Sequence, residues 1–147
     1  MINFIIVSVA ALFCAIMSFP AFAADPNSGC VEALRAADVV AMRDGASTDL
    51  GGQAALIEKA CAKSTGDVRQ LKAGLVLELR AVAALQQGRT PATVGKALSM
   101  LETSSQLFSN CANAKDTEVA ASCGFLKAVV EKTAEALIAP AEPSQDA

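Results

Sequence analysis

The residue types that most often carry out chemistry in proteins are scarce in this chain of 147 residues, and histidine, tryptophan and tyrosine are absent. Without histidine there are no imidazole zinc ligands and no Ser-His or Cys-His nucleophile pairs. No serine lies in an S-x-x-K or G-x-S-x-G motif, and Gly51-Gly52-Gln53 lacks the Lys-Ser/Thr ending of a phosphate-binding loop. The sequence therefore predicts no catalytic residues, no metal site and no cofactor, and we expect a protein that is not an enzyme.

Cysteine is the most informative residue type. Four of the five cysteines follow the apolar N-terminal segment, namely Cys30, Cys61, Cys111 and Cys123. None lies in a C-x-x-C motif, so no zinc ribbon, thioredoxin-type redox site or haem attachment is encoded. An even number in an exported chain predicts structural disulfides. Of the three possible arrangements we expect Cys30–Cys61 and Cys111–Cys123, because each pair then joins neighbouring antiparallel helices.

One carboxylate breaks the apolar pattern of the third expected helix. At 100° per residue, Glu78 falls inside an arc formed by apolar side chains, namely Leu71, Leu75, Val82 and Leu85. Such a group is either a ligand-binding or acid-base carboxylate in a cleft, or a structural one. The structural interpretation, which we favour, pairs Glu78 with Arg35, Arg43 or Lys59, or places it at the edge of a groove.

The first 23 residues differ from the rest of the chain. They are strongly apolar and end in Ala21-Phe22-Ala23, the small-x-small pattern of a secretory cleavage site. The segment predicts a cleaved signal peptide, and hence a periplasmic or secreted protein with no stable membrane anchor. The alternative is an uncleaved anchor, because no Lys or Arg precedes the apolar run, although Ser18 and Pro20 disfavour a membrane span.

Composition favours helices in the remainder. Alanine is abundant and only Phe108 and Phe125 supply aromatic rings, whereas strands prefer β-branched and aromatic residues. The net charge is −3, and the cations are spread singly from Arg35 to Lys132. Nucleic acid is therefore not an expected partner, because phosphate binding needs clustered Lys and Arg.

Apolar spacing and punctuation predict five helices between residues 24 and 138. The first follows a loop at residues 25–29 and ends at about residue 43, and the second is shorter and ends at about residue 63. The other three are expected at about residues 67–87, 91–110 and 116–138, and a disordered tail at 139–147. The short connections predict an all-α, up-and-down bundle of four to five antiparallel helices stapled by two disulfides. A two-repeat tetratricopeptide-like solenoid is the alternative.

The faces of two helices bear on packing and binding. In the second helix we expect Leu56, Ile57, Ala60 and Cys61 on the buried side. In the fifth helix three charged side chains, Lys127, Glu131 and Glu135, are expected to face outward. These three residues are the candidate contacts for another protein.

The segment Leu107–Val130 resembles a short piece of the small periplasmic immunity proteins that neutralise type VI secretion amidase effectors. The matching positions are Cys111, Cys123, Gly124 and Phe125. In that family the piece lies near the start of the mature chain, whereas here it ends the domain. The resemblance implies an immunity-type periplasmic protein as one alternative function.

These observations together favour an exported, non-enzymatic protein-interaction module of the inhibitor, adaptor or chaperone type. A compact acidic bundle without catalytic residues suits binding to another protein. The second function class is a carrier of a small apolar ligand in a bundle pocket, with Glu78 closing or orienting that pocket.

Overall fold

A computed structural model of the chain describes residues 27, 29–30, 32–34 and 49–139. The predicted signal peptide lies outside these residues, as do most of the first expected helix, Arg35 and Arg43 included, and the tail beyond Ala139. Residues 29–30 and 32–34 are helical and belong to the start of that first helix.

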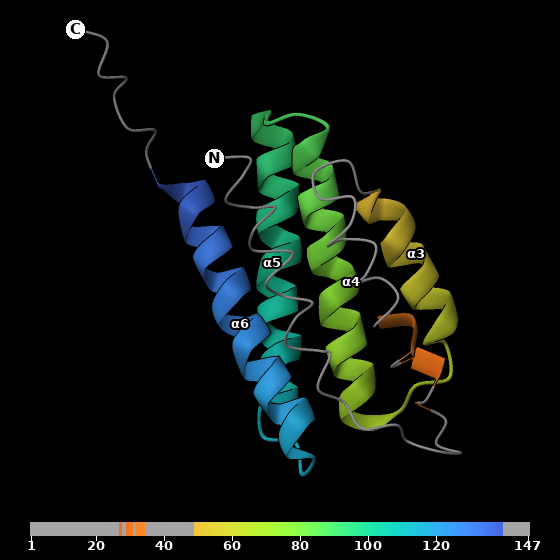
Figure 1. The fold of residues 1–147 in the computed structure, drawn as a ribbon. Coiled ribbons are helices and arrows are strands. Elements are labelled where there is room, and N and C mark those ends of the chain that lie inside the picture. Colours follow the sequence, from red (N-terminus) through yellow and green to blue (C-terminus); the bar gives the residue numbers. More distant parts are fainter. Residues whose placement is uncertain (1–26, 28, 31, 35–48, 140–147) are drawn as a thin grey trace, which may run out of the picture.

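Four helices are described from end to end, and they form an up-and-down bundle (Figure 1). They are α3 (Leu50–Ala60), α4 (Gly66–Gln86), α5 (Pro91–Cys111) and α6 (Thr117–Ile138). Consecutive helices lie side by side, with α4 between α3 and α5, and α6 against the other side of α5. The predicted all-α bundle is therefore confirmed, and no strand occurs within the described residues.

Side-chain caps explain where three of the helices begin. The Asp49 carboxylate accepts the Gly52 N–H at 2.9 Å, which supports a first turn that two glycines would otherwise weaken. The Thr90 hydroxyl accepts the Thr93 N–H at 3.2 Å. Asp116 accepts the N–H groups of Glu118 and Val119 at the start of α6. α5 and α6 begin within one residue of the starts expected from the sequence, whereas α3 ends at Ala60, before the expected end at about residue 63.

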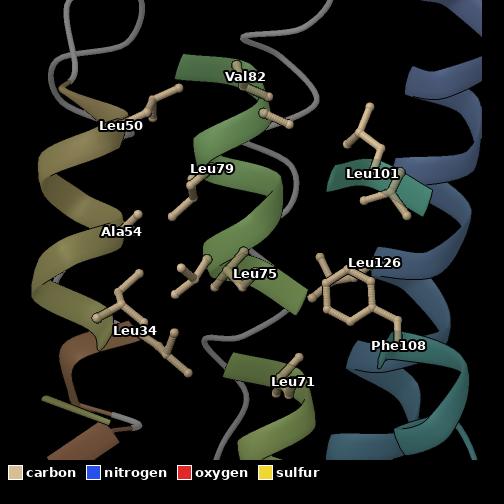
Figure 2. Packing of buried hydrophobic residues seen from close by; sticks show 14 of the residues in the cluster. Leu34, Leu50, Ala54, Leu71, Leu75, Leu79, Val82, Leu101, Phe108 and Leu126 are labelled. Atoms are coloured by element: carbon tan, nitrogen blue, oxygen red, sulfur yellow. The ribbon is translucent and has the colours of Figure 1, made fainter. Parts of the chain in front are cut away.

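Leucine, valine and alanine side chains, with Ile57, Phe108 and the four cysteines of the two bridges, form the core along both sides of α4 (Figure 2). α3 buries Leu50, Ala54 and Ile57, which are spaced four and three residues apart. The expectation for α3 was wrong at two positions, because Leu56 is 60% exposed and Ala60 is also exposed. Only one narrow stripe of α3 meets α4, so the side chains flanking that stripe face solvent.

α4 and α5 pack tightly against each other at Gly74. The buried Phe108 ring lies over this glycine, and a Cβ added there would stand 2.6 Å from the ring Cε1 atom. One hydrogen bond crosses at the same place, from the Ser104 hydroxyl to the Gly74 carbonyl oxygen at 2.8 Å. The α4–α5 contact therefore requires a residue without a side chain at position 74.

Gly74→Ala is expected to lower the free energy of unfolding by about 2 kcal/mol, because the methyl group displaces a fully buried ring. The matched control is Gly95→Ala in α5, where nothing lies within 4 Å of the added Cβ. That substitution should stabilise the helix by about 0.5–1 kcal/mol. Urea unfolding of the two variants measures the difference, and equal stabilities would contradict the close packing.

The two disulfides join the elements that the sequence predicted. Cys30–Cys61 ties the N-terminal helical residues to the end of α3, with Cα atoms 4.4 Å apart. Cys111–Cys123 ties the end of α5 to the second turn of α6, with Cα atoms 5.8 Å apart. All four cysteines are buried, so both bridges lie inside the core. The pairing expected from helix adjacency is confirmed.

Candidate functional site

Glu78 lies on the apolar face of α4, as the helical spacing predicted, and is only 2% exposed. Gly74 and Val82, one turn before and one turn after it, are buried on the same face. Within the described part of the chain Glu78 forms no ion pair, and its Oε2 atom has no hydrogen-bond partner. The carboxyl group is therefore held in an apolar environment.

Burial raises the pKa of Glu78 from 4.5 to about 8, because the charged form loses its hydration. At neutral pH the side chain is then mainly a neutral acid. Lys59, one of the three cations expected as its partner, is exposed and forms no ion pair with it. The other two, Arg35 and Arg43, lie outside the described residues. The near-complete burial of Glu78 also rules out a position at the edge of an open groove.

A groove of about 440 Å³ runs between α5 and α6. Five apolar side chains line it: Leu98, Leu101, Val130, Ala134 and Ile138. Polar side chains complete the lining, namely Glu102, Ser105, Gln106, Glu131 and Glu135. Glu78 is not among these residues, so the buried carboxyl group and the groove are separate features.

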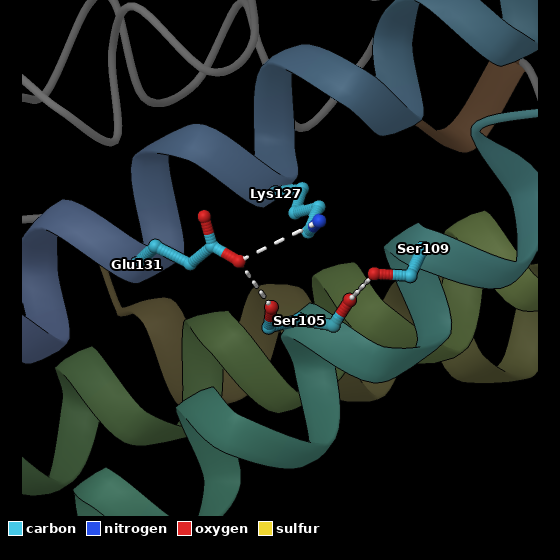
Figure 3. Close-up of polar contacts among 4 residues, drawn as sticks. All are labelled: Ser105, Ser109, Lys127 and Glu131. Carbon is cyan, nitrogen blue, oxygen red and sulfur yellow. Dashed lines mark hydrogen bonds and ion pairs between the residues drawn. The ribbon is translucent and has the colours of Figure 1, made fainter.

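At one end of the groove a polar contact links the two helices (Figure 3). The Glu131 carboxylate accepts a hydrogen bond from the Ser105 hydroxyl at 3.1 Å, and Lys127 Nζ lies 3.8 Å from the same oxygen. Ser109 in turn donates its hydroxyl to the Ser105 carbonyl at 3.0 Å. All of these groups are partly or fully exposed, so the contact orients Glu131 without contributing much stability.

The antiparallel register set by Ser105 and Glu131 places Leu98 opposite Ile138 at the far end of the groove. Ile138 is 70% exposed, the largest value among the exposed large apolar side chains of the described residues. Neither Glu102 nor Glu135 forms an ion pair within the described residues. The groove thus combines apolar side chains that are partly uncovered, at Leu98, Ala134 and Ile138, with carboxylates at Glu102 and Glu135 that form no ion pair there.

The structure brings two of the predicted contact residues, Glu131 and Glu135, to this groove. Lys127 lies one turn away and touches it only through Glu131. Sequence reasoning missed Glu102 and Ile138. The spacing of residues 131, 134, 135 and 138 marks one face of α6, but nothing in the sequence indicates that α5 leaves this face partly uncovered.

Comparison of the chain with protein-family models, curated proteins and solved structures finds no match. The case for a function therefore rests on the residues themselves. Within the described residues no helix is both long and apolar enough to cross a bilayer. The same residues hold no group of three or more Cys, Asp or Glu side chains placed to bind a metal ion.

Proposed function

We propose that this chain is an exported, non-enzymatic protein-interaction module that acts by binding, and that the groove between α5 and α6 is its contact surface. The observation that carries the proposal is the groove itself, which places an apolar floor between exposed carboxylates on two adjacent helices. Protein contact surfaces combine an apolar centre with a polar rim in this way.

The rigidity of the two helices supports this proposal. The faces of α5 and α6 next to the groove are buried in the core through residues that include Phe108 and Leu126. The Cys111–Cys123 bridge joins the two helices at one end. A surface whose shape is fixed before binding loses little conformational entropy on association, which favours affinity.

Export is the second part of the proposal. The two disulfides are compatible with an extracellular or periplasmic location, because such bridges persist in oxidising compartments. The apolar segment ending in Ala21-Phe22-Ala23 supports the same location and fits a cleaved leader.

The groove favours a protein partner over a small apolar ligand. Its volume is within the range of small-molecule sites, but such sites bury most of the ligand surface. Here Glu102, Glu131, Glu135 and Ile138 are all exposed, so the groove is open along its length. An open surface of this kind suits a partner that brings its own apolar side chains.

A Glu131→Lys/Glu135→Lys double variant is expected to lose its protein partner. The native exported protein, immobilised through its C-terminus, would be incubated with the envelope fraction of its source cells. We expect one protein to be retained, and the double variant to retain it at least about fivefold less, because two rim charges are reversed. The melting temperature of the double variant should change little, since both side chains are exposed.

The matched control is Glu32→Lys, a charge reversal at an exposed position outside the groove. This variant should retain the partner as the unchanged protein does. Equal loss in both variants would show that general charge, not the groove, governs binding. Co-purification of an apolar small molecule in place of a protein would favour the carrier function instead.

A further inference from the structure

The chemistry of the groove specifies its occupant more closely. Resting on the proposed binding function, we infer that the groove receives a cationic amphipathic helix of a partner protein, whose apolar face covers the floor while its Lys or Arg side chains meet Glu102, Glu131 and Glu135. The inference rests on three features of the described residues: an apolar floor that is partly uncovered, the charge of both rims, and the length of the groove.

The floor requires apolar side chains from the occupant. Leu98 and Ala134 are only half-buried, and Ile138 is left largely in water. Covering apolar surface of this kind is favourable in proportion to its area. Contact between the last turn of α6 and the apolar face of a partner would therefore bury the most exposed apolar surface in the groove.

The two rims require positive charge. Glu102 projects from α5, and Glu131 and Glu135 project from α6, so carboxylates flank the floor on both sides. One of the ion pairs within the described residues involves these carboxylates, that of Lys127 with Glu131 at the end near Ser105. A partner helix with cations on both flanks of its apolar stripe would match this arrangement, and an acidic one would be repelled.

The length of the groove suits a short helical segment. Its α6 side extends from Val130 to Ile138, which is about two helical turns or roughly 12 Å. A helix that lies in a groove of this length contacts it through side chains at positions i, i+3 or i+4, and i+7. An apolar stripe with this spacing would therefore cover the floor.

Charge disfavours the two occupants that the chain itself could supply. The C-terminal segment 139–147 carries Glu142 and Asp146 and no cation. A second copy of the chain brings a net charge of −3. Both would set negative charge against the acidic rims, so an external cationic partner fits better.

The test uses the full mature, disulfide-bonded protein and synthetic helical peptides of about 14 residues, enough for the two contacting turns with a turn at each end. The probe peptide has Leu at positions i, i+3, i+4 and i+7 and Lys at the flanking positions. One control peptide carries Glu in place of Lys, and another keeps the composition but scrambles the Leu spacing. Calorimetric titration at low salt should show binding of the probe at least about tenfold tighter than either control.

Variants of the protein test whether the probe peptide binds in the groove. The double substitution Glu102→Gln/Glu135→Gln should lower the affinity for the probe peptide about fivefold and make that affinity less dependent on salt, because two rim charges are removed. Ile138→Ser should weaken it by a similar factor. The matched control is Leu56→Ser, which removes another exposed large apolar side chain on α3, outside the groove, and should leave the affinity unchanged.

Equal binding of the three peptides, or equal effects of Ile138→Ser and Leu56→Ser, would overturn the inference. So would dimerisation through the groove in sedimentation, or tighter probe binding after removal of residues 140–147, since a second copy or the tail would then be the occupant. If the probe fails while Glu131→Lys/Glu135→Lys still abolishes capture of an envelope protein, the cationic helix is wrong and the binding function stands.

Discussion

The Glu78→Gln variant is expected to keep its free energy of unfolding as the pH rises from 4.5 to 8, whereas the unchanged protein is expected to lose about 5 kcal/mol over the same range. The carboxyl group has a pKa of about 8 when folded and 4.5 when unfolded. Between these values the unfolded chain releases the proton and the folded chain keeps it, so rising pH favours unfolding. The free energy of unfolding is therefore highest below pH 4.5, and it falls as the pH rises until Glu78 has ionised in the folded protein as well.

Urea unfolding at a series of pH values measures this effect. The Gln variant has no proton to release, so its stability should stay nearly constant across the window and exceed that of the unchanged protein at pH 8. Glu131→Gln is the matched control, because the same change at an exposed position should leave the pH dependence in place. A flat profile for the unchanged protein would show that Glu78 is solvated or paired.

Removing the Cys30–Cys61 bridge by a double Ala substitution is expected to cost about 4 kcal/mol, and removing Cys111–Cys123 about 3 kcal/mol. The first bridge spans 31 residues and the second 12, and the longer loop restricts the unfolded chain more. Alanine is used because the cysteines are buried, and a serine hydroxyl there would lose its hydrogen bonds to water. Thermal unfolding under non-reducing conditions compares the two variants.

The two bridges should also differ in their effect on the groove. Cys111–Cys123 joins the helices that form it, whereas Cys30–Cys61 lies at the α3 end of the bundle. Loss of the first bridge should therefore weaken peptide binding, and loss of the second should change stability alone. The reverse order of stabilities would show that packing around the bridges outweighs loop length.

The ends and faces of most helices could be predicted from the sequence because they depend on local chemistry. Asp49 and Asp116 cap helices through their own side chains, and Pro91 opens α5 where a missing N–H costs nothing. The stripe from Ala97 to Cys111 follows the helical repeat and is buried. The disulfide pairing followed as well, because short connections make consecutive helices neighbours.

Only the tertiary structure decided which part of each apolar face is covered. Periodicity placed Leu56 on the inner side of α3, but the stripe of α3 that is buried consists of Leu50, Ala54 and Ile57. The requirement for Gly74 arises from the distant Phe108, and no spacing within α4 reveals it. The groove exists because α5 and α6 leave Ile138 uncovered while aligning Glu102 with carboxylates from another helix. Such features depend on distances between residues far apart in the chain, whereas helical spacing describes each helix alone.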